Sequence, residues 1–318
     1  MDSRDISVND VLAARTRVAG HTWRTPVERS AWLSEAAQTD VYLKLECFQR
    51  TGSFKVRGAF NAVATLTDAG RARGLVTASA GNHGQAVALA ASRFGARATI
   101  FVPRSAPEAK KSRIRGFGAV LDDRFESYDD AEDAAVRWAA ERDATFVHAF
   151  SDPAVVAGQA TTALEVLEDV PAVRTVVIPL GGGGLMAGMG LVLKEAKVRV
   201  LGVQSDRTPN VHAALAAGRL VDCPVVPTLA DGLAGRTDAI SVERVARVAD
   251  AVLLVPEETL APAIRELFVR EGVVAEGAGI VAVAALLAGR VPVDGPVVLV
   301  ISGRNLDSRT LARILEGS

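Results

Sequence analysis

One lysine in this sequence has surroundings that favour covalent chemistry. Lys55 lies in the stretch Thr51-Gly52-Ser53-Phe54-Lys55-Val56-Arg57-Gly58, after a small polar turn and between two apolar side chains, near the start of a predicted helix. A partly desolvated lysine near a helix N-terminus has a lowered pKa, and its neutral amine can form an imine with a carbonyl group. A solvated charge at a helix start is the alternative interpretation.

A run of four glycines is the second chemical feature. Gly181–Gly184 follow the apolar stretch Thr175–Ile178 and precede a predicted helix that starts at Leu185. Glycines at a helix N-terminus expose backbone N–H groups, which together with the helix dipole bind an anion such as phosphate. A packing turn is one alternative. A dinucleotide site is another, because Gly182, Gly184 and Ala187 fit G-x-G-x-x-A, with Asp206 roughly 20 residues further on.

Two further junctions carry polar or small residues. Ser79-Ala80-Gly81-Asn82-His83 leads into a helix, where exposed backbone donors suit a carboxylate and the Asn82 amide can donate a hydrogen bond. Ser302 and Gly303 follow another apolar stretch near the end of the sequence. A polar capping turn is the alternative interpretation of the stretch that contains Asn82.

The elements that must position these residues follow an alternating pattern. Apolar, β-branched runs alternate with alanine-rich helical stretches, which predicts an open α/β fold with parallel sheets covered on both faces. Ligands of such folds bind beyond the carboxyl ends of the strands, where the motifs above lie. The predicted strands are Val41–Leu45, Leu75–Thr77, Ala98–Val102, Val120–Asp122, Thr175–Ile178, Val198–Val203, Ala251–Val255 and Val297–Ile301. The predicted helices are Phe54–Leu66, Gly84–Phe94, Glu108–Phe117, Asp130–Arg142, Val155–Leu167 and Leu185–Glu195.

Composition argues against several classes of protein. The 318 residues have a net charge of −1, so nothing indicates binding to nucleic acid or to an anionic membrane surface. Cys47 and Cys223 form no C-x-x-C pair, which argues against a zinc or dithiol redox site. We expect two reduced thiols in the cytoplasm, and one disulfide between them is the alternative. The first residues lack the profile of a signal peptide, and the longest apolar run, Gly277–Gly289, is too short to span a bilayer.

Taken together, the motifs resemble one family. Ser53–Gly58, Ser79–Gln85, Gly181–Leu185 and Ser302-Gly303 are similar, in the same order, to the threonine/serine dehydratase and serine racemase family of fold-type II pyridoxal-phosphate enzymes. The resemblance covers nearly the whole chain. It implies a tryptophan synthase β-like fold with open, twisted, mostly parallel sheets. It also implies a large domain, residues 1–70 with 146–318, and a small mobile domain, residues 71–145.

The resemblance assigns roles to individual residues. Lys55 forms the imine with pyridoxal 5′-phosphate, Phe54 packs beside the cofactor, and Asn82 donates to its 3′-oxygen. Ser302 faces the pyridine nitrogen, and a serine is too weak an acid to keep that nitrogen protonated, which suits loss of a β-substituent over transamination. The cofactor phosphate is held by Gly181, Gly182, Gly183, Gly184 and Leu185. The substrate carboxylate is held by the backbone around Ser79, Ala80, Gly81, Asn82 and His83.

The implied reaction is the α,β-elimination of water and ammonia from a β-hydroxy amino acid such as L-threonine or L-serine, giving a 2-oxo acid. Lys55 removes the Cα proton. Racemases of the family carry a serine at the position of Ala80, so elimination is favoured over racemization. Departures in Leu233–Asp238 and at Arg304 leave open a bulkier substrate, such as phenylserine or a hydroxyectoine-derived compound. The sequence also leaves open an amino-acid racemase, a β-replacement enzyme, a dinucleotide-dependent oxidoreductase and a non-catalytic amino-acid sensor.

The remaining expectations concern ions and assembly. Gln204 and Asn210 stand where metal-activated members of the family carry carboxylates, so we expect no divalent metal site, whereas a monovalent cation held by backbone carbonyls stays open. The resemblance implies a homodimer or homotetramer. We expect no regulatory domain after Leu306–Leu315, and from that expectation a role in amino-acid catabolism.

Overall fold

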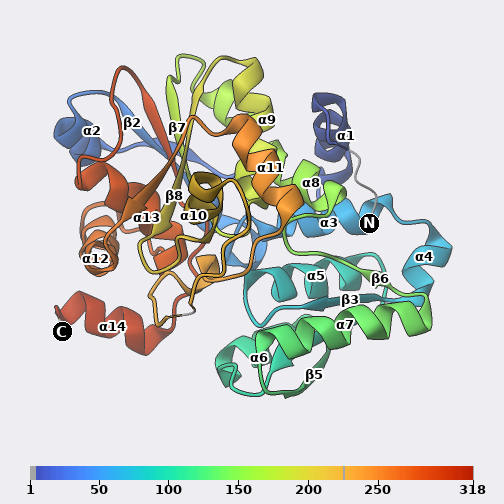
Figure 1. The fold of residues 1–318 in the computed structure, drawn as a ribbon. Helices are drawn as coiled ribbons and strands as arrows, with labels where there is room; N and C mark the ends of the chain where they lie inside the picture. Colours follow the sequence, from blue (N-terminus) through green and yellow to red (C-terminus); the bar gives the residue numbers. More distant parts are fainter. Residues whose placement is uncertain (1–4, 225, 318) are drawn as a thin grey trace. The chain divides into compact units, whose positions relative to one another are not determined.

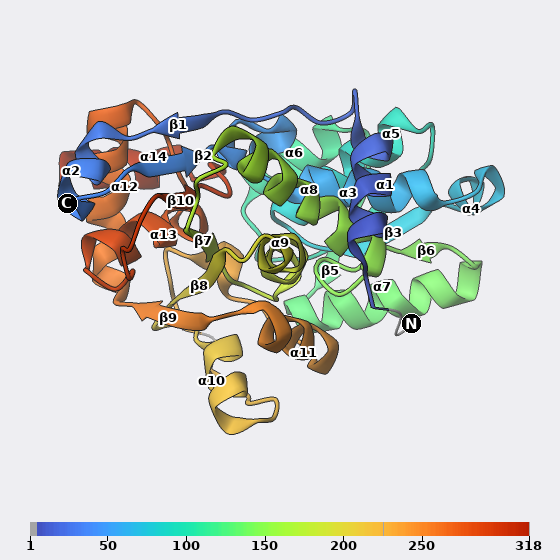
Figure 2. The same ribbon diagram turned by 90° about the horizontal axis from the view of Figure 1, so that it is seen from above.

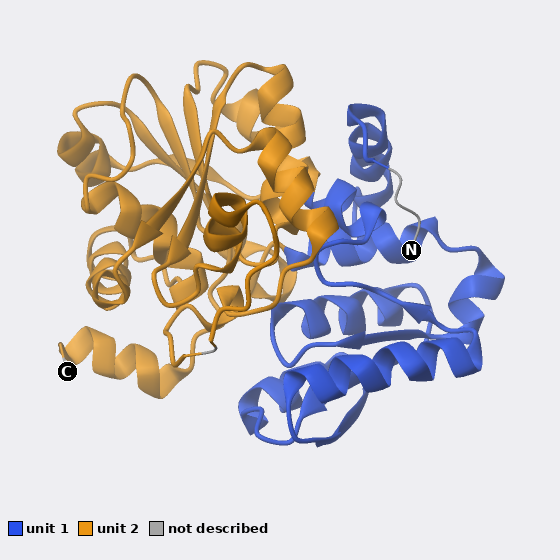
Figure 3. Ribbon diagram, viewed as in Figure 1, with its two compact units in different colours: residues 1–23, 55–159 blue, residues 24–54, 160–318 orange. Residues whose placement is uncertain are grey.

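The computed structural model describes residues 5–224 and 226–317. The chain divides into two compact units, coloured separately in Figure 3. Unit 1 comprises residues 1–23 and 55–159, and unit 2 comprises residues 24–54 and 160–318. Because the chain passes from unit 2 into unit 1 between Phe54 and Lys55, these two neighbouring residues belong to different units.

A six-stranded sheet forms the centre of unit 2. Its strand order is β1-β2-β10-β7-β8-β9, and all neighbouring pairs are parallel except β1 with β2. Leu299 of β10 lies opposite Val177 of β7, so both strands end at the same edge of the sheet. The strands are β1 (Val27–Arg29), β2 (Val41–Lys44), β7 (Thr175–Pro179), β8 (Arg199–Ser205), β9 (Ala251–Val255) and β10 (Val297–Val300).

Helices cover both faces of this sheet. The wholly apolar helix α13 (Gly277–Leu287) lies across β7, β8, β9 and β10, and α9 (Gly184–Glu195) packs on β7 and β8 from the opposite face (Figure 2). Every residue of β7 and of β10 is buried, as expected for central parallel strands covered on both faces. The other helices with residues in this unit are α2 (Ala31–Ala37), α8 (Pro153–Asp169), α10 (Asn210–Ala217), α11 (Ala239–Val248), α12 (Leu260–Glu271) and α14 (Ser308–Glu316).

Unit 1 is built on a smaller, parallel sheet with the order β5-β4-β3-β6. The helices α5 and α7 pack on its two faces, above and below β3 in Figure 1. The strands are β3 (Leu75–Ala78), β4 (Ala98–Pro103), β5 (Val120–Phe125) and β6 (Thr145–Phe146). The helices are α1 (Val8–Val18), α3 (Lys55–Thr65), α4 (Asp68–Arg73), α5 (Asn82–Arg93), α6 (Glu108–Gly116) and α7 (Tyr128–Arg142), with the first residues of α8.

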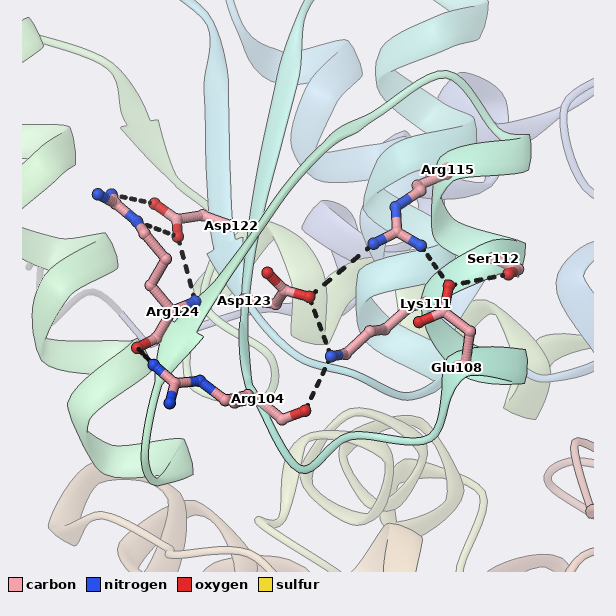
Figure 4. A network of polar contacts seen from close by, with 8 residues as sticks. All are labelled: Arg104, Glu108, Lys111, Ser112, Arg115, Asp122, Asp123 and Arg124. Carbon is pink, nitrogen blue, oxygen red and sulfur yellow. Dashed lines mark hydrogen bonds and ion pairs between the residues drawn. The ribbon is translucent and has the colours of Figure 1, made fainter.

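Charged side chains fasten α6 to β5 in unit 1 (Figure 4). The ammonium group of Lys111 is nearly buried and donates to the Arg104 carbonyl at 2.9 Å and to the Asp123 carboxylate at 3.0 Å. Arg115 binds the Glu108 carboxylate at 2.5 Å and lies 3.9 Å from Asp123. The pKa of Asp123 is lowered, chiefly by its hydrogen bond from Lys111. This network ties the loop after β4 to the strand that follows α6.

The elements agree with the sequence-based pattern, with a few differences. Each of the eight predicted strands and six predicted helices is present, with ends shifted by a few residues. The helix after the polar turn begins at Lys55, and α5 begins at Asn82, two residues before the predicted start. The strands β1 and β6 were not predicted, because three and two residues are too few for a periodic pattern.

The bounds of the compact units also differ from the predicted domains, since unit 1 includes α1, α3 and the start of α8 in addition to residues 71–145. The predicted mobility of residues 71–145 stays a prediction.

Among the described residues, no helix combines the length and apolar character that crossing a membrane would need.

Candidate active site

Lys55 is the first residue of α3, and its amine is held inside unit 1. Its Nζ donates a hydrogen bond to the carbonyl of Ala149 at 2.8 Å. Burial lowers the pKa of Lys55 to about 8, because a desolvated ammonium loses part of its hydration energy. Near neutral pH a larger fraction of this lysine than of a solvated lysine is therefore the neutral amine, which is the nucleophilic and proton-accepting form.

The turn before Lys55 is fastened to the end of β10 in unit 2. Thr51 has φ of +60° and Gly52 has φ of +74°, so the chain turns sharply before α3. The Asn305 side chain donates to the Thr51 carbonyl at 2.7 Å, and the backbone N–H of Phe54 donates to the Ser302 carbonyl at 3.1 Å. Phe54 and Ser302, two predicted cofactor contacts, are thus brought together.

The loop Ser79–His83 connects β3 to α5. The backbone N–H of Gly81 donates to the Ser79 hydroxyl at 3.2 Å, and the helix begins at Asn82. A Cβ added at Gly84 would lie 2.2 Å from the Ser79 carbonyl oxygen, so the loop folds back onto the first turn of the helix. Since the first-turn N–H groups of a helix have no intrahelical acceptor, this loop presents donors suited to a carboxylate.

His83 is the buried member of this loop. Its Nε2 lies 2.9 Å from the carbonyl oxygen of Val147. Burial lowers the pKa of His83 to about 3, and the charge of Lys55 acts in the same direction. The imidazole is therefore neutral at physiological pH, and its Nε2 carries the proton because a carbonyl only accepts.

The glycine loop lies between β7 and α9 in unit 2. Gly183 has φ of +107°, a backbone conformation that favours glycine. A Cβ added at Gly181 would lie 3.3 Å from the Cα of Leu233, and the Thr237 hydroxyl donates to the Gly182 carbonyl at 3.3 Å. The loop is thus packed closely against neighbouring backbone, and α9 begins at Gly184, where the first-turn N–H groups have no intrahelical acceptor.

These residues fit pyridoxal phosphate on chemical grounds. A partly buried amine with a lowered pKa suits an aldehyde, and a glycine loop at a helix start suits a phosphate dianion. Ser302 follows β10 closely, is buried, and offers a neutral hydroxyl for a ring nitrogen. Lys55 and the loop Ser79–His83 belong to unit 1, whereas Phe54, the glycine loop and Ser302 belong to unit 2.

Sequence reasoning missed the segment Val147–Ser151, which follows β6. It receives hydrogen bonds from two predicted site residues, Lys55 and His83, through its backbone carbonyls. The His148 side chain accepts hydrogen bonds from the backbone N–H groups of Phe150 and Ser151 at 3.3 and 3.2 Å, which shapes the segment. Backbone carbonyls carry no residue signature, so only the neighbouring His148 could have drawn attention to this stretch.

Two amides occupy the positions considered for a divalent metal. Gln204 donates from Nε2 to the Asn210 Oδ1 at 2.6 Å, and Asn210 donates in turn to the Gly235 carbonyl. The Gln204 Oε1 accepts from the backbone N–H of His212 at 2.9 Å. Over residues 5–224 and 226–317, no group of three or more His, Cys, Asp or Glu side chains is arranged to hold a metal ion.

Comparisons with known proteins agree with this chemistry. A family model described as pyridoxal-phosphate dependent enzyme matches residues 18–303. The chain is 44% identical to an L-threonine ammonia-lyase of Thermotoga maritima over 98% of this chain and 78% of that protein. It is 35% identical to the catabolic L-threonine dehydratase of Escherichia coli over 97% of this chain and 96% of that protein. Among solved structures, maize serine racemase superposes with a TM-score of 0.93 at 30% identity, covering 99% of this chain and 98% of that one.

The predicted fold class is confirmed by these comparisons, as is the predicted resemblance. The family match also argues against a dinucleotide site at Gly182, Gly184 and Ala187, since the matched region includes this loop.

Proposed function

Since this chain belongs to the family of pyridoxal-phosphate-dependent enzymes, we propose that it is an ammonia-lyase acting on L-threonine or L-serine. The products are a 2-oxo acid and ammonia. The observation that carries the proposal is the partly buried Lys55 amine at the start of α3, which the Ala149 carbonyl holds at 2.8 Å and whose pKa is lowered to about 8. The names of the relatives, L-threonine ammonia-lyase and L-threonine dehydratase, give the reaction class and the first substrate to test.

The proposed binding residues are those whose chemistry suits the cofactor and the substrate. Bound pyridoxal phosphate supplies an electron sink for the charge that develops at Cα. The backbone N–H groups of Gly181–Leu185 hold its phosphate, Phe54 packs beside the ring, Asn82 donates to the 3′-oxygen and Ser302 contacts the ring nitrogen. The substrate carboxylate binds the N–H groups of the loop Ser79–His83 at the start of α5.

Lys55 is the proposed catalytic base. Its neutral amine takes the Cα proton of the bound amino acid and keeps it on Nζ as an ammonium. The lowered pKa raises the share of the neutral form before the transfer, and the Ala149 carbonyl at 2.8 Å accepts a hydrogen bond from the protonated form after it. The β-hydroxyl of the substrate leaves as water with a proton that the phosphate of the bound cofactor would supply. Water then hydrolyses the released enamine product to the 2-oxo acid and ammonia.

Ala80 supports elimination over racemization. A racemase needs a second group that delivers a proton to the opposite face of Cα, and a methyl side chain cannot hold a proton. We therefore propose that L-serine is deaminated without accumulation of D-serine.

The proposed enzyme requires a monovalent cation and no divalent metal ion. A monovalent cation bound by backbone carbonyls assists activity, and the Gln204–Asn210 amide pair takes the place of a divalent site. Activity that survives EDTA but falls when potassium is replaced by tetramethylammonium would support this ion requirement.

The enzyme is proposed to be a cytoplasmic homodimer or homotetramer. Sedimentation velocity tests the assembly, and cell fractionation tests the location.

The function is tested with purified protein, pyridoxal phosphate and L-threonine. We expect 2-oxobutyrate and ammonia in equal amounts, with lower activity on phenylserine or hydroxyectoine-derived substrates. Lys55→Ala removes turnover, whereas Lys194→Ala, which alters a surface lysine, does not. Formation of D-serine from L-serine without a 2-oxo acid would contradict the proposed lyase activity and would show that the protein is a racemase.

A further inference from the structure

The segment Val147–Ala149 links two parts of the proposed site within unit 1. The Val147 carbonyl accepts a hydrogen bond from His83 Nε2 at 2.9 Å, and two residues later the Ala149 carbonyl accepts one from Lys55 Nζ at 2.8 Å. His83 is the last residue of the loop Ser79–His83, which presents donors to the substrate carboxylate, and it lies in the first turn of α5. One short backbone segment therefore contacts both the substrate loop and the proposed base.

The same Val147 carbonyl has a second donor with a different origin. The Thr77 hydroxyl donates to it at 2.8 Å, and the Val147 N–H donates to the Val76 carbonyl at 2.9 Å. Thr77 and Val76 belong to β3, inside the sheet, so they anchor Val147 to the sheet without involving the loop. The His83 hydrogen bond differs because it comes from the substrate loop itself, at the start of α5.

The His83 hydrogen bond persists over the pH range in which such an enzyme works. The imidazole is 3% exposed, and burial keeps it neutral with its proton on Nε2. The titratable groups that act on it, Lys55 and His148, both disfavour its protonation. The imidazole is thus a permanent donor to Val147 and takes no part in proton transfer.

We propose that His83 is a positioning residue that couples the loop Ser79–His83 to Lys55 through the backbone of Val147–Ala149. When the loop is in place, the Nε2–H donor fixes the Val147 carbonyl, and the Ala149 carbonyl then holds the Lys55 amine in one orientation. The inference rests on the proposed function in one respect, that Lys55 is the base. The coupling of the loop Ser79–His83 to the segment Val147–Ala149 does not depend on the identity of the substrate.

Three substitutions separate this role from a general contribution to stability. His83→Gln keeps an N–H donor at about the reach of Nε2, whereas His83→Asn is an amide too short to reach the Val147 carbonyl. Thr77→Val removes the other donor to the same carbonyl and preserves side-chain shape. All three are compared with wild type by hydrogen–deuterium exchange of the backbone amides in 148–151 and by kinetics with L-threonine and α-deuterated L-threonine.

We expect His83→Asn to exchange faster in 148–151 and to lower kcat by about 10- to 100-fold, the loss typical of a misplaced catalytic group. Its primary isotope effect on kcat/KM should rise, because proton transfer to Lys55 becomes slower. His83→Gln should recover most of both properties, and Thr77→Val should resemble wild type.

Equal effects of His83→Asn and Thr77→Val, or no recovery in His83→Gln, would overturn the proposal. If the wild-type protein does not convert L-threonine, the proposed function fails. The exchange comparison still decides the coupling in that case.

Discussion

Lys55 differs from a surface lysine in the free energy of its charged form. Burial opposes the ammonium, and the pKa of about 8 is the result. We expect the cofactor-free protein to form its imine with added pyridoxal phosphate at a rate that rises with pH and is half-maximal near pH 8. An ordinary lysine titrates at about 10.4. Stopped-flow absorbance measures this rate, with Lys55→Ala as the blank. A midpoint near pH 10 would show that the amine is solvated.

His83 gives a second prediction at the residue scale. Its folded pKa of about 3 lies below the unfolded value of about 6.5, so the unfolded chain binds more protons between these values. The contribution of His83 to stability is complete above pH 6.5 and is lost as the pH falls towards 3. Between pH 7 and pH 5 the loss is about 2 kcal/mol at 1.36 kcal/mol per pH unit below 6.5.

Urea unfolding at the two pH values checks this prediction. Because glutamine does not titrate, His83→Gln should lose less free energy of unfolding than wild type over the same pH interval. Equal losses in the two proteins would mean that His83 is accessible to protons in the folded state.

Side-chain chemistry at the site was predictable from sequence, but its backbone partners were not. Lys55, the loop containing Asn82 and the glycine run were identified because residue types and spacing mark a helix start after a strand or turn. The backbone carbonyls of Val147 and Ala149 have no such sequence signature. Their positions depend on the pairing of β6 with β3, which are far apart in the sequence. The assignments of individual cofactor and substrate contacts stay predictions.

At the scale of elements, a buried ion pair joins β2 to α8 within unit 2. Lys44 is fully buried and binds the Glu165 carboxylate at 2.6 Å and the Thr25 carbonyl at 2.8 Å. We expect Lys44→Met to lower the free energy of unfolding by about 3 kcal/mol, because it takes the ammonium group of Lys44 away from a mostly buried carboxylate. Lys194→Met is the matched control, since Lys194 binds Asp250 at 2.7 Å with both side chains more than a third exposed. The control should change stability by less than about 1 kcal/mol, and similar losses in the two variants would contradict this expectation.

The glycine loop gives the second prediction at this scale. A Cβ at Gly183 would sit 3.2 Å from Val245 Cγ2, on a backbone with φ of +107°. Strain of about 1–2 kcal/mol displaces the N–H groups proposed to bind phosphate, so Gly183→Ala should weaken pyridoxal phosphate binding by about tenfold. Gly116→Ala is the control, because a Cβ there meets nothing within 4 Å. Absorbance titration measures both affinities. An unchanged affinity in Gly183→Ala would show that the cofactor phosphate does not bind at this loop.

At the scale of the whole molecule, the α/β class was predictable and the sheet order was not. Apolar strands and alanine-rich helices alternate along the chain, which is a local property. The order β2-β10-β7 places a strand from the end of the sequence between two earlier ones, and no local pattern contains that information. The antiparallel strand β1 could likewise not be predicted from the local sequence, since it is defined by its pairing with β2.

The central claim is that Lys55 carries pyridoxal phosphate, and borohydride reduction tests it most directly. The purified enzyme is reduced, digested and analysed by mass spectrometry, beside Lys55→Ala treated in the same way. We predict a visible absorbance band that disappears on reduction and a phosphopyridoxyl group on the peptide containing Lys55, absent from the variant. Labelling of a different lysine, or no labelling after incubation with the cofactor, would contradict the assignment of this site.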